Sequence, residues 1–144
     1  GGFLYVNSDL YFTEKSIGLL LRNKHQSSMM VDHLDKISKD MFKVQIRGNR
    51  ILSMDKNLPL SESDALGIGP VYLNSDNSKK VKKHLDSLII SGEKNMWCYS
   101  VFDSLLDQIS LNSIFINGEF WCEVDTLEDY EILLNFLENN NISI

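Results

Sequence analysis

The sequence contains few of the residues that mark several common classes of protein. It has two cysteines among 144 residues, and Cys98 and Cys122 form neither a CxxC pair nor the ligand spacing of a zinc site. The three histidines show no metal-ligand spacing such as HxxxH. No apolar run approaches the length of a membrane span, and the first residues lack the basic region and cleavage site of a signal peptide. We therefore expect a soluble, cytoplasmic protein with reduced thiols and no disulfide scaffold.

Basic residues are also scarce. Fourteen Lys and Arg against 20 Asp and Glu give a net charge of -6 and a pI near 5.0. Contacts to nucleic-acid phosphates need clustered basic side chains, so a dedicated nucleic-acid binder is disfavoured. No Ser-His-Asp or Cys-His arrangement suggests covalent catalysis, and "GIGP" lacks the third glycine of a dinucleotide-binding loop. An acidic protein can still bind a nucleotide when metal ions offset the charge.

What is present is an alternation of apolar strands and amphipathic helices. Hydrophobic residues make up 43% of the chain, enough for one sizeable core, and we expect a single domain over residues 1–144. The patterns predict strands at 3–12, 27–33 and 64–74, hairpins at 42–56 and 113–125, and helices at 13–24, 77–90, 95–109 and 126–140. The first strand, helix and strand read as a βαβ unit, which predicts a mixed, mostly parallel sheet with flanking helices.

Several local signals refine this prediction. Thr13 is a plausible helix N-cap, and Thr126 with Asp129 forms a variant of the capping box. The first hairpin should turn at Gly48-Asn49 and the second at Asn117-Gly118. Pro70 in the middle of a strand requires a bulge if that strand is central.

Two aspartates are candidate functional residues because they lie at predicted strand ends. Asp9 ends the first strand, and Asp125 lies between a late strand and the final helix. Helix capping accounts for Thr126 and Asp129 but not for Asp125, and open α/β sheets place ligand sites at strand ends. A turn-forming role for each aspartate is the simpler interpretation. Trp97 and Trp121 fit core positions, although a ring at a pocket edge could stack on a base or a choline-like group.

Four segments together resemble the nucleotidyltransferases that act on sugar phosphates, phosphocholine or phosphonates. "FLYVNSDLYF" is similar to their strand ending in Asn-Gly-Asp, and "WCEVDTLEDYE" to their late Trp-x-Glu-Ile-Asp-Thr segment. "DMFKVQIRGNRILSMDKNL" resembles their hairpin ending in a lysine, and "SESDALGIGPVYLN" their strand with Gly-Glu-x-x-Gly-Ile. The order and rough spacing agree over nearly the whole chain.

The resemblance implies a Mg²⁺-dependent transfer of a nucleotidyl group, with CMP preferred, from a nucleoside triphosphate to a small phosphorylated or phosphonate acceptor. Asp9 and Asp125 would hold Mg²⁺, and Lys56 would lie near the acceptor phosphate, assisted by Lys43 or Arg47 from the same hairpin. Ser8 replaces the glycine usual before the first metal-binding aspartate.

The family's opening signature, a glycine-rich loop with an arginine and a following Pro-Lys pair, is absent from this sequence. The resemblance therefore implies the later part of a nucleotidyltransferase domain, without its first strands and inactive by itself. Its partners would be the nucleotide, the acceptor and the missing N-terminal part or a second chain. Two alternatives stay open: a non-catalytic fragment or degenerate subunit that binds a partner through an uncovered sheet, and a metal-dependent glycosyltransferase of related fold. The phosphatases of the haloacid dehalogenase class are disfavoured, because Tyr11 occupies the position of their second acidic residue.

Overall fold

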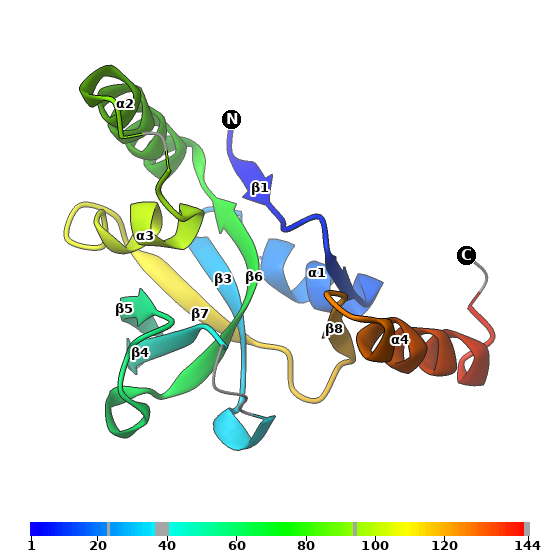
Figure 1. Cartoon of the computed structure of the whole chain (residues 1–144). Helices are drawn as coiled ribbons and strands as arrows, with labels where there is room; N and C mark the ends of the chain where they lie inside the picture. Colours follow the sequence, from blue (N-terminus) through cyan, green and yellow to red (C-terminus); the bar gives the residue numbers. More distant parts are fainter. Residues whose placement is uncertain (23, 37–40, 94, 143–144) are drawn as a thin grey trace.

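The structure, a computed structural model, describes residues 1–22, 24–36, 41–93 and 95–142 (Figure 1). Its strands are β1 (Phe3–Tyr5), β2 (Leu10–Phe12), β3 (Ser27–Asp32), β4 (Lys43–Arg47), β5 (Arg50–Asp55), β6 (Ala65–Leu73), β7 (Leu111–Phe115) and β8 (Trp121–Glu123). Its helices are α1 (Glu14–Leu21), α2 (Ser75–Ser91), α3 (Cys98–Asp103) and α4 (Leu127–Asn139), with short 3-10 helices η1 (Leu34–Lys36) and η2 (Leu60–Glu62). None of the helices in these ranges combines the length and the hydropathy that crossing a bilayer requires.

Strand β6 organises the main sheet. Among the described residues this sheet has the strand order β1-β6-β3-β7-β5-β4, and the start of β6 also pairs with β4. The pairings thus run in a closed circuit from β6 through β3, β7, β5 and β4 back to β6. Strands β2 and β8 form a separate two-stranded antiparallel sheet.

The predicted mixed sheet with flanking helices is confirmed, but the balance of strand directions differs from the expectation of mostly parallel pairing. Within the described residues, β3 and β7 form the one parallel pair, and the remaining pairings are antiparallel. Strands β1 and β3 run in the same direction, as a βαβ unit requires, but β6 lies between them and pairs antiparallel with both. Apolar periodicity identifies a buried strand but does not say which strand will lie beside it.

A predicted turn and a predicted bulge in the main sheet are both confirmed. The first hairpin joins β4 and β5 through Gly48, whose φ of +64° favours glycine. Pro70 lies inside β6, at a β-bulge. Between the pairs Met29–Val71 and Val31–Gly67, β3 has one residue and β6 has three, including Pro70. The bulge lets proline occupy a central strand because the regular ladder is interrupted there.

The two predicted helix N-caps are confirmed, whereas α1, α2 and α3 differ from their predicted bounds, α2 beginning at Ser75 and not at residue 77. Thr13 caps α1, and Thr126 and Asp129 form a reciprocal capping box on α4. Helix α1 ends at Leu21, earlier than predicted, and residue 23 of that prediction lies outside the described residues. The predicted helix at 95–109 forms only α3, followed by a series of tight turns. These turns still bury Leu105 and Ile109. The apolar spacing that predicted a helix here is therefore also satisfied by a series of turns.

The second predicted hairpin is wrong in its pairing. Asn117 and Gly118 do form a tight turn, with φ of +51° and +83°. However, β7 joins β3 and β5 in the main sheet, whereas β8 leaves to pair with β2. The chain therefore crosses from one sheet to the other at this turn.

The main sheet is covered on both faces. Met29 and Val31 of β3 pack into a core cluster with Tyr99 and Phe102 of α3, whereas Met30 packs on the opposite face with Leu20 of α1. All of these side chains are buried, which explains why three apolar residues stand in a row, at 29–31, in the middle of β3. Figure 1 shows α2 and α3 on one side of the sheet, α1 on the other, and α4 extending beyond β8 away from the main sheet.

Candidate functional site

A pocket lies between the main sheet and β8. Its lining comes from the loop after β1, the entry to β4, the end of the first hairpin, β6, the start of α3, and β8; the residues are Asn7, Met41, Phe42, Lys56, Leu66, Gly67, Ile68, Gly69, Trp97, Tyr99, Trp121 and Glu123. Its enclosed volume is about 70 Å³. Pockets that enclose a whole small-molecule ligand begin at roughly 300 Å³. A ligand in this pocket would therefore extend out of it.

The floor of the pocket is the backbone of β6 at two glycines. A Cβ atom on Gly67 would overlap the ring of Phe42, and one on Gly69 would lie 2.9 Å from the hydroxyl oxygen of Tyr99. Gly69 also has a φ of +130°, which favours glycine. Both glycines are needed because aromatic rings pack directly on the strand.

One wall is aromatic and carries a lysine at its edge. The rings of Phe42, Trp97 and Tyr99 contact one another with centroid distances between 4.6 and 5.1 Å. The Tyr99 hydroxyl lies 3.0 Å from both Asn7 Oδ1 and the carbonyl oxygen of Gly69. Burial raises the pKa of Tyr99, so its hydroxyl is a neutral donor. Lys56 Nζ lies 5.4 Å from the centroid of the Trp97 ring, within cation–π range.

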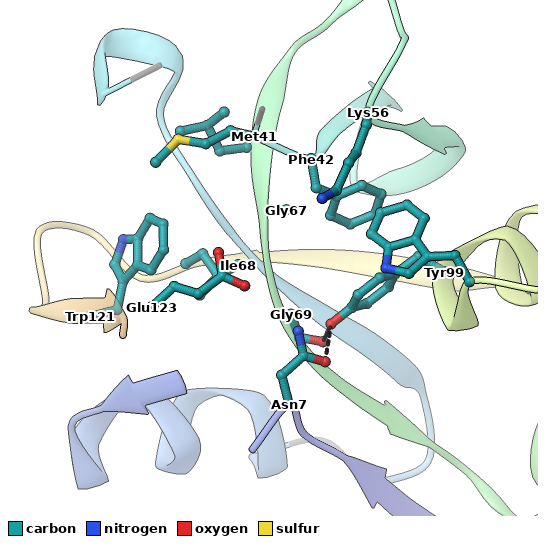
Figure 2. A pocket seen from close by; sticks show the side chains of 12 residues that line it. Asn7, Met41, Phe42, Lys56, Gly67, Ile68, Gly69, Tyr99, Trp121 and Glu123 are labelled. Atoms are coloured by element: carbon teal, nitrogen blue, oxygen red, sulfur yellow. Dashed lines mark hydrogen bonds between the residues drawn. The ribbon is translucent and has the colours of Figure 1, made fainter. Parts of the chain in front are cut away.

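The opposite wall is formed by two side chains of β8. Trp121 and Glu123 are two residues apart on a strand and therefore point to the same side, and Figure 2 shows both facing Lys56 and Tyr99 across the pocket. Partial burial raises the pKa of Glu123, and the carboxylates of Asp125 and Asp9 raise it further, whereas Lys56 opposes the shift. The pocket edge is thus an acidic cluster facing one lysine.

The structure brings the two predicted aspartates together. Asp9 lies in the turn between β1 and β2, and Asp125 follows β8. The carbonyl oxygen of Asp9 accepts a hydrogen bond of 2.8 Å from the backbone N–H of Val124, the residue before Asp125. Both aspartates are exposed, and both act on Glu123. They converge because β2 pairs with β8, and not because they end neighbouring strands of a parallel sheet.

The two predicted lysines differ in their surroundings. Lys56 is exposed and lines the pocket. Lys43 is only 8% exposed and does not line it; its Nζ donates to the carbonyl oxygens of Met41 and Lys56. Arg47 is exposed at the far end of β4, next to the hairpin turn. The ammonium group of Lys43 thus binds the backbone that carries Lys56. A direct contact between Lys43 and a ligand remains a prediction.

The acidic cluster has the donor chemistry of a magnesium site. Mg²⁺ prefers oxygen ligands and is commonly bound by one or two carboxylates, with waters and substrate phosphates completing its shell. Among the described residues no group of three or more His, Cys, Asp or Glu side chains is arranged to hold a metal ion. The role of Asp9 and Asp125 as a metal-binding pair stays a prediction, and two carboxylates would leave the other positions of the ion to water and substrate.

Among the polar side chains that line the pocket, three were not predicted as site residues: Asn7, Tyr99 and Glu123. Glu123 could have been found from the sequence. It lies two residues after Trp121 and two before Asp125, so in a strand these side chains lie on the same face. Asn7 and Tyr99 could not, since they are 92 residues apart and only the tertiary structure places them in contact.

Solved structures with this fold are known, although no protein-family model matches the sequence and no curated protein is detectably similar to it. The inositol-1-phosphate CTP transferase of T. maritima superimposes with a TM-score of 0.66 at 19% identity, covering 95% of this chain and 56% of its own. The CTP:phosphocholine cytidylyltransferase of Streptococcus pneumoniae gives a TM-score of 0.70 at 16% identity, covering 93% and 57%. A UDP-glucose pyrophosphorylase from Acinetobacter baumannii gives 0.65 at 10%, covering 94% and 50%.

The chain has the fold of these nucleotidyltransferases. Nearly all of it is matched, but it spans only about half the length of each solved chain. At these identities the likeness shows the fold, and the chemistry has to be argued from the pocket.

Proposed function

We propose that this chain carries the metal and acceptor side of a Mg²⁺-dependent nucleotidyltransferase, which transfers CMP by preference from CTP to a small phosphorylated acceptor. The observation that carries the proposal is the convergence of Asp9 and Asp125 beside Glu123 and Lys56 at the mouth of an aromatic pocket. The acidic groups come from both ends of the sequence and the lysine from its middle, and they are gathered in a fold that known nucleotidyltransferases share.

The reaction explains why such groups are needed. A phosphate oxygen of the acceptor attacks the α-phosphorus of the nucleoside triphosphate, the bond to the β-phosphate oxygen breaks, and pyrophosphate leaves. Both reactants are anions, so their repulsion has to be offset. A Mg²⁺ ion held by Asp9 and Asp125 would screen this charge, and Lys56 would place a positive charge near the acceptor phosphate. No protein nucleophile is required, because the acceptor phosphate is already ionised.

The pocket favours an acceptor with a positively charged head, such as phosphocholine. Trp97 and Trp121 offer partly exposed aromatic rings around it, and Glu123 supplies a carboxylate. Quaternary ammonium groups bind to aromatic faces through cation–π attraction, which strengthens when the site is partly desolvated. An inositol or glucose phosphate would instead require several hydrogen-bond donors and acceptors on these walls.

Turnover by this chain alone is not expected. Metal ions do not orient a triphosphate by themselves, and correct positioning supplies a large share of the rate. Since the solved chains with this fold are nearly twice as long, we propose that the remaining part of the fold supplies the triphosphate cradle. Steady pyrophosphate release from CTP and phosphocholine by the purified chain, abolished by a chelator, would contradict this.

A partner-binding role is the second candidate, and the edge of the sheet favours it. Within the described residues β1 pairs on one side only, with β6, and Phe3 and Leu4 are 41% and 37% exposed. A groove of about 410 Å³ runs beside this edge and is lined by Phe3, Val81 and Leu85 among others. The occupant would be a strand from the rest of the nucleotidyltransferase fold. Slow hydrogen exchange of the β1 amides in the monomeric chain would argue against this role.

The metal site is tested by removing one carboxylate at a time. Asp125→Asn keeps the side-chain size, so the protein should be as stable as before or slightly more stable, while Mn²⁺ affinity in the presence of CTP falls by about tenfold or more. Asp9→Asn should behave alike, and the double variant should lose less than the sum of the two, because both changes destroy one site. Binding would be measured by Mn²⁺ electron paramagnetic resonance, with the chain joined to the part that supplies the cradle.

Asp129→Asn is the matched control for this experiment. Its carboxylate accepts hydrogen bonds from Thr126 and Asp125 in the capping box, so the change should weaken α4 and leave the metal unaffected. Equal losses of Mn²⁺ affinity in Asp125→Asn and Asp129→Asn would show that Asp125 acts only in the local structure of the helix cap and is not a metal ligand. Hydrolysis of a UDP-sugar in place of CTP would favour the glycosyltransferase alternative.

A further inference from the structure

We propose that Asp32 is a positioning residue that fixes the β8 wall of the pocket through Trp121. The inference rests on the proposed function, because the wall it fixes is the one assigned to the acceptor. The carboxylate of Asp32 lies at the end of β3, and the residue is 2% exposed. Its Oδ2 accepts a hydrogen bond of 2.8 Å from the indole Nε1 of Trp121.

This hydrogen bond joins two sheets that share no strand pairing among the described residues. Asp32 belongs to the main sheet and Trp121 to the sheet of β2 and β8. Trp121 also packs, partly buried, against the core cluster on the α1 face, which is made of Leu20, Met30, Ile68 and Ile116. Packing alone would let the ring slide or rotate, whereas a charge-assisted hydrogen bond fixes its direction. The distance between the pocket floor on β6 and the β8 wall is thereby set.

The geometry of β8 extends the effect of Asp32 to Glu123. Trp121 and Glu123 lie on one side of the strand, and Cys122 points to the other side, where it is buried near the backbone of Asp129. Fixing Trp121 fixes the face that β8 presents, so the Glu123 carboxylate is held toward the pocket. Asp32 does not line the pocket and would act only through these two residues.

The buried carboxylate of Asp32 would lower the stability of the fold if it had no hydrogen-bond donors. Burying a charge is unfavourable unless hydrogen bonds compensate it, and the second oxygen, Oδ1, accepts from the backbone N–H of His33 at 2.9 Å. A neutral acceptor would also satisfy the indole N–H, but with a weaker hydrogen bond. The charged side chain adds a stronger and more directional bond, as expected where a ring must keep one orientation.

The test uses the two indole N–H signals of the protein, since it contains only Trp97 and Trp121. In ¹H–¹⁵N spectra of the full chain, Asp32→Ala should shift the Trp121 indole signal and speed its hydrogen exchange by about tenfold, the loss expected for one hydrogen bond to a charged group. The Trp97 signal should move little. Asp32→Asn retains an acceptor oxygen and should restore most of the exchange protection.

The functional readout is phosphocholine binding measured by calorimetry on the same chain. Asp32→Ala should weaken it by about tenfold. Trp121→Phe, which keeps an aromatic ring but removes the N–H, should weaken it similarly, and the two changes together should cost less than their sum.

Asp103→Ala is the matched control. The Asp103 carboxylate also holds backbone and side-chain donors, with Met54 N at 2.7 Å, but lies outside the pocket. It should lower stability without moving the Trp121 signal or the affinity. An unmoved Trp121 signal in Asp32→Ala, or an affinity loss no greater than in Asp103→Ala, would overturn the inference. Failure of the unsubstituted chain to bind phosphocholine would overturn the acceptor class instead, and the indole signals would still decide whether Asp32 holds Trp121.

Discussion

The main sheet and the smaller unit formed by β2, β8 and α4 are stabilised in different ways. In the main sheet, all of β3 and most of β6 are buried, and core side chains are removed from water on both faces. In the smaller unit, α4 buries only Leu137, while Leu127 is 82% exposed and Tyr130 and Ile132 are about half exposed. Each region therefore depends on a different kind of interaction.

The smaller unit is held by local and directional contacts. Its helix is fixed by the capping box, and the rings of Phe120 and Phe136 stack with centroids 3.8 Å apart. Glu119, in the turn before β8, pairs with Lys15 and accepts a hydrogen bond from Thr13. The candidate metal and acceptor groups lie where this unit meets the main sheet. The pocket floor on β6 is therefore part of a large buried core, whereas the pocket wall on β8 is held by a small number of directional contacts.

The largest expected effect comes from a cavity in the main sheet. Leu111→Ala removes a fully buried side chain of β7 and should lower the free energy of unfolding by about 2 to 5 kcal/mol, as buried Leu→Ala changes commonly do. Leu127→Ala on α4 is the matched change at an exposed position and should stay within about 0.5 kcal/mol. Urea denaturation measures both. Similar losses in the two variants would erase the distinction between the regions.

A smaller loss is expected at the pocket floor. Gly67→Ala places a methyl group into the ring of Phe42 and 2.9 Å from Met29 Cε, and such overpacking costs typically about 1 to 3 kcal/mol. The Phe42 ring should move, and with it the rings of Trp97 and Tyr99. Near-ultraviolet circular dichroism would detect the change. Gly18→Ala on α1, where nothing lies within 4 Å, is the control and should be neutral or mildly stabilising.

The capping box predicts a local effect. Thr126→Ala removes the side-chain oxygen that accepts from the backbone N–H of Asp129, and loss of such an N-cap costs about 1 kcal/mol. Amide exchange of α4 should quicken by roughly fivefold, while that of β3 should change much less. Equal acceleration in both elements would show that α4 unfolds only together with the main sheet.

The smallest effects are two pH dependences of opposite sign. The pKa of Glu123 is raised above its ordinary value of 4.5, so its ionised form disfavours the fold as pH rises through the shifted pKa. Glu123→Gln should therefore raise the urea midpoint slightly at pH 7 and not below about pH 4.

The pKa of Asp129 is lowered from 3.8 by hydrogen bonds from Thr126, so its contribution to stability is present above that value and lost as pH falls. Asp129→Asn should accordingly lower the midpoint at pH 7 and have little effect in strong acid. The same sign for both variants would contradict the assignment.

Local chemistry was readable from the sequence where neighbouring residues decide it. Thr13, the capping box at Thr126 and the turn at Gly48 follow from side-chain hydrogen bonds and permitted backbone angles within a few positions. Pro70 predicted a bulge because proline cannot donate to a regular ladder. Asp125 stood out because helix capping did not account for it.

Only the tertiary structure decided which strands meet. Strand β6 lies between β1 and β3, and β8 leaves β7 to pair with β2, although the apolar patterns allowed other neighbours. That second choice carries Asp125 to Asp9 and points Glu123 and Trp121 into one pocket, and it brings Asp32 within hydrogen-bonding distance of an indole 89 residues away. Strand pairing is set by how all buried faces fit together at once, and no short stretch of sequence contains that information.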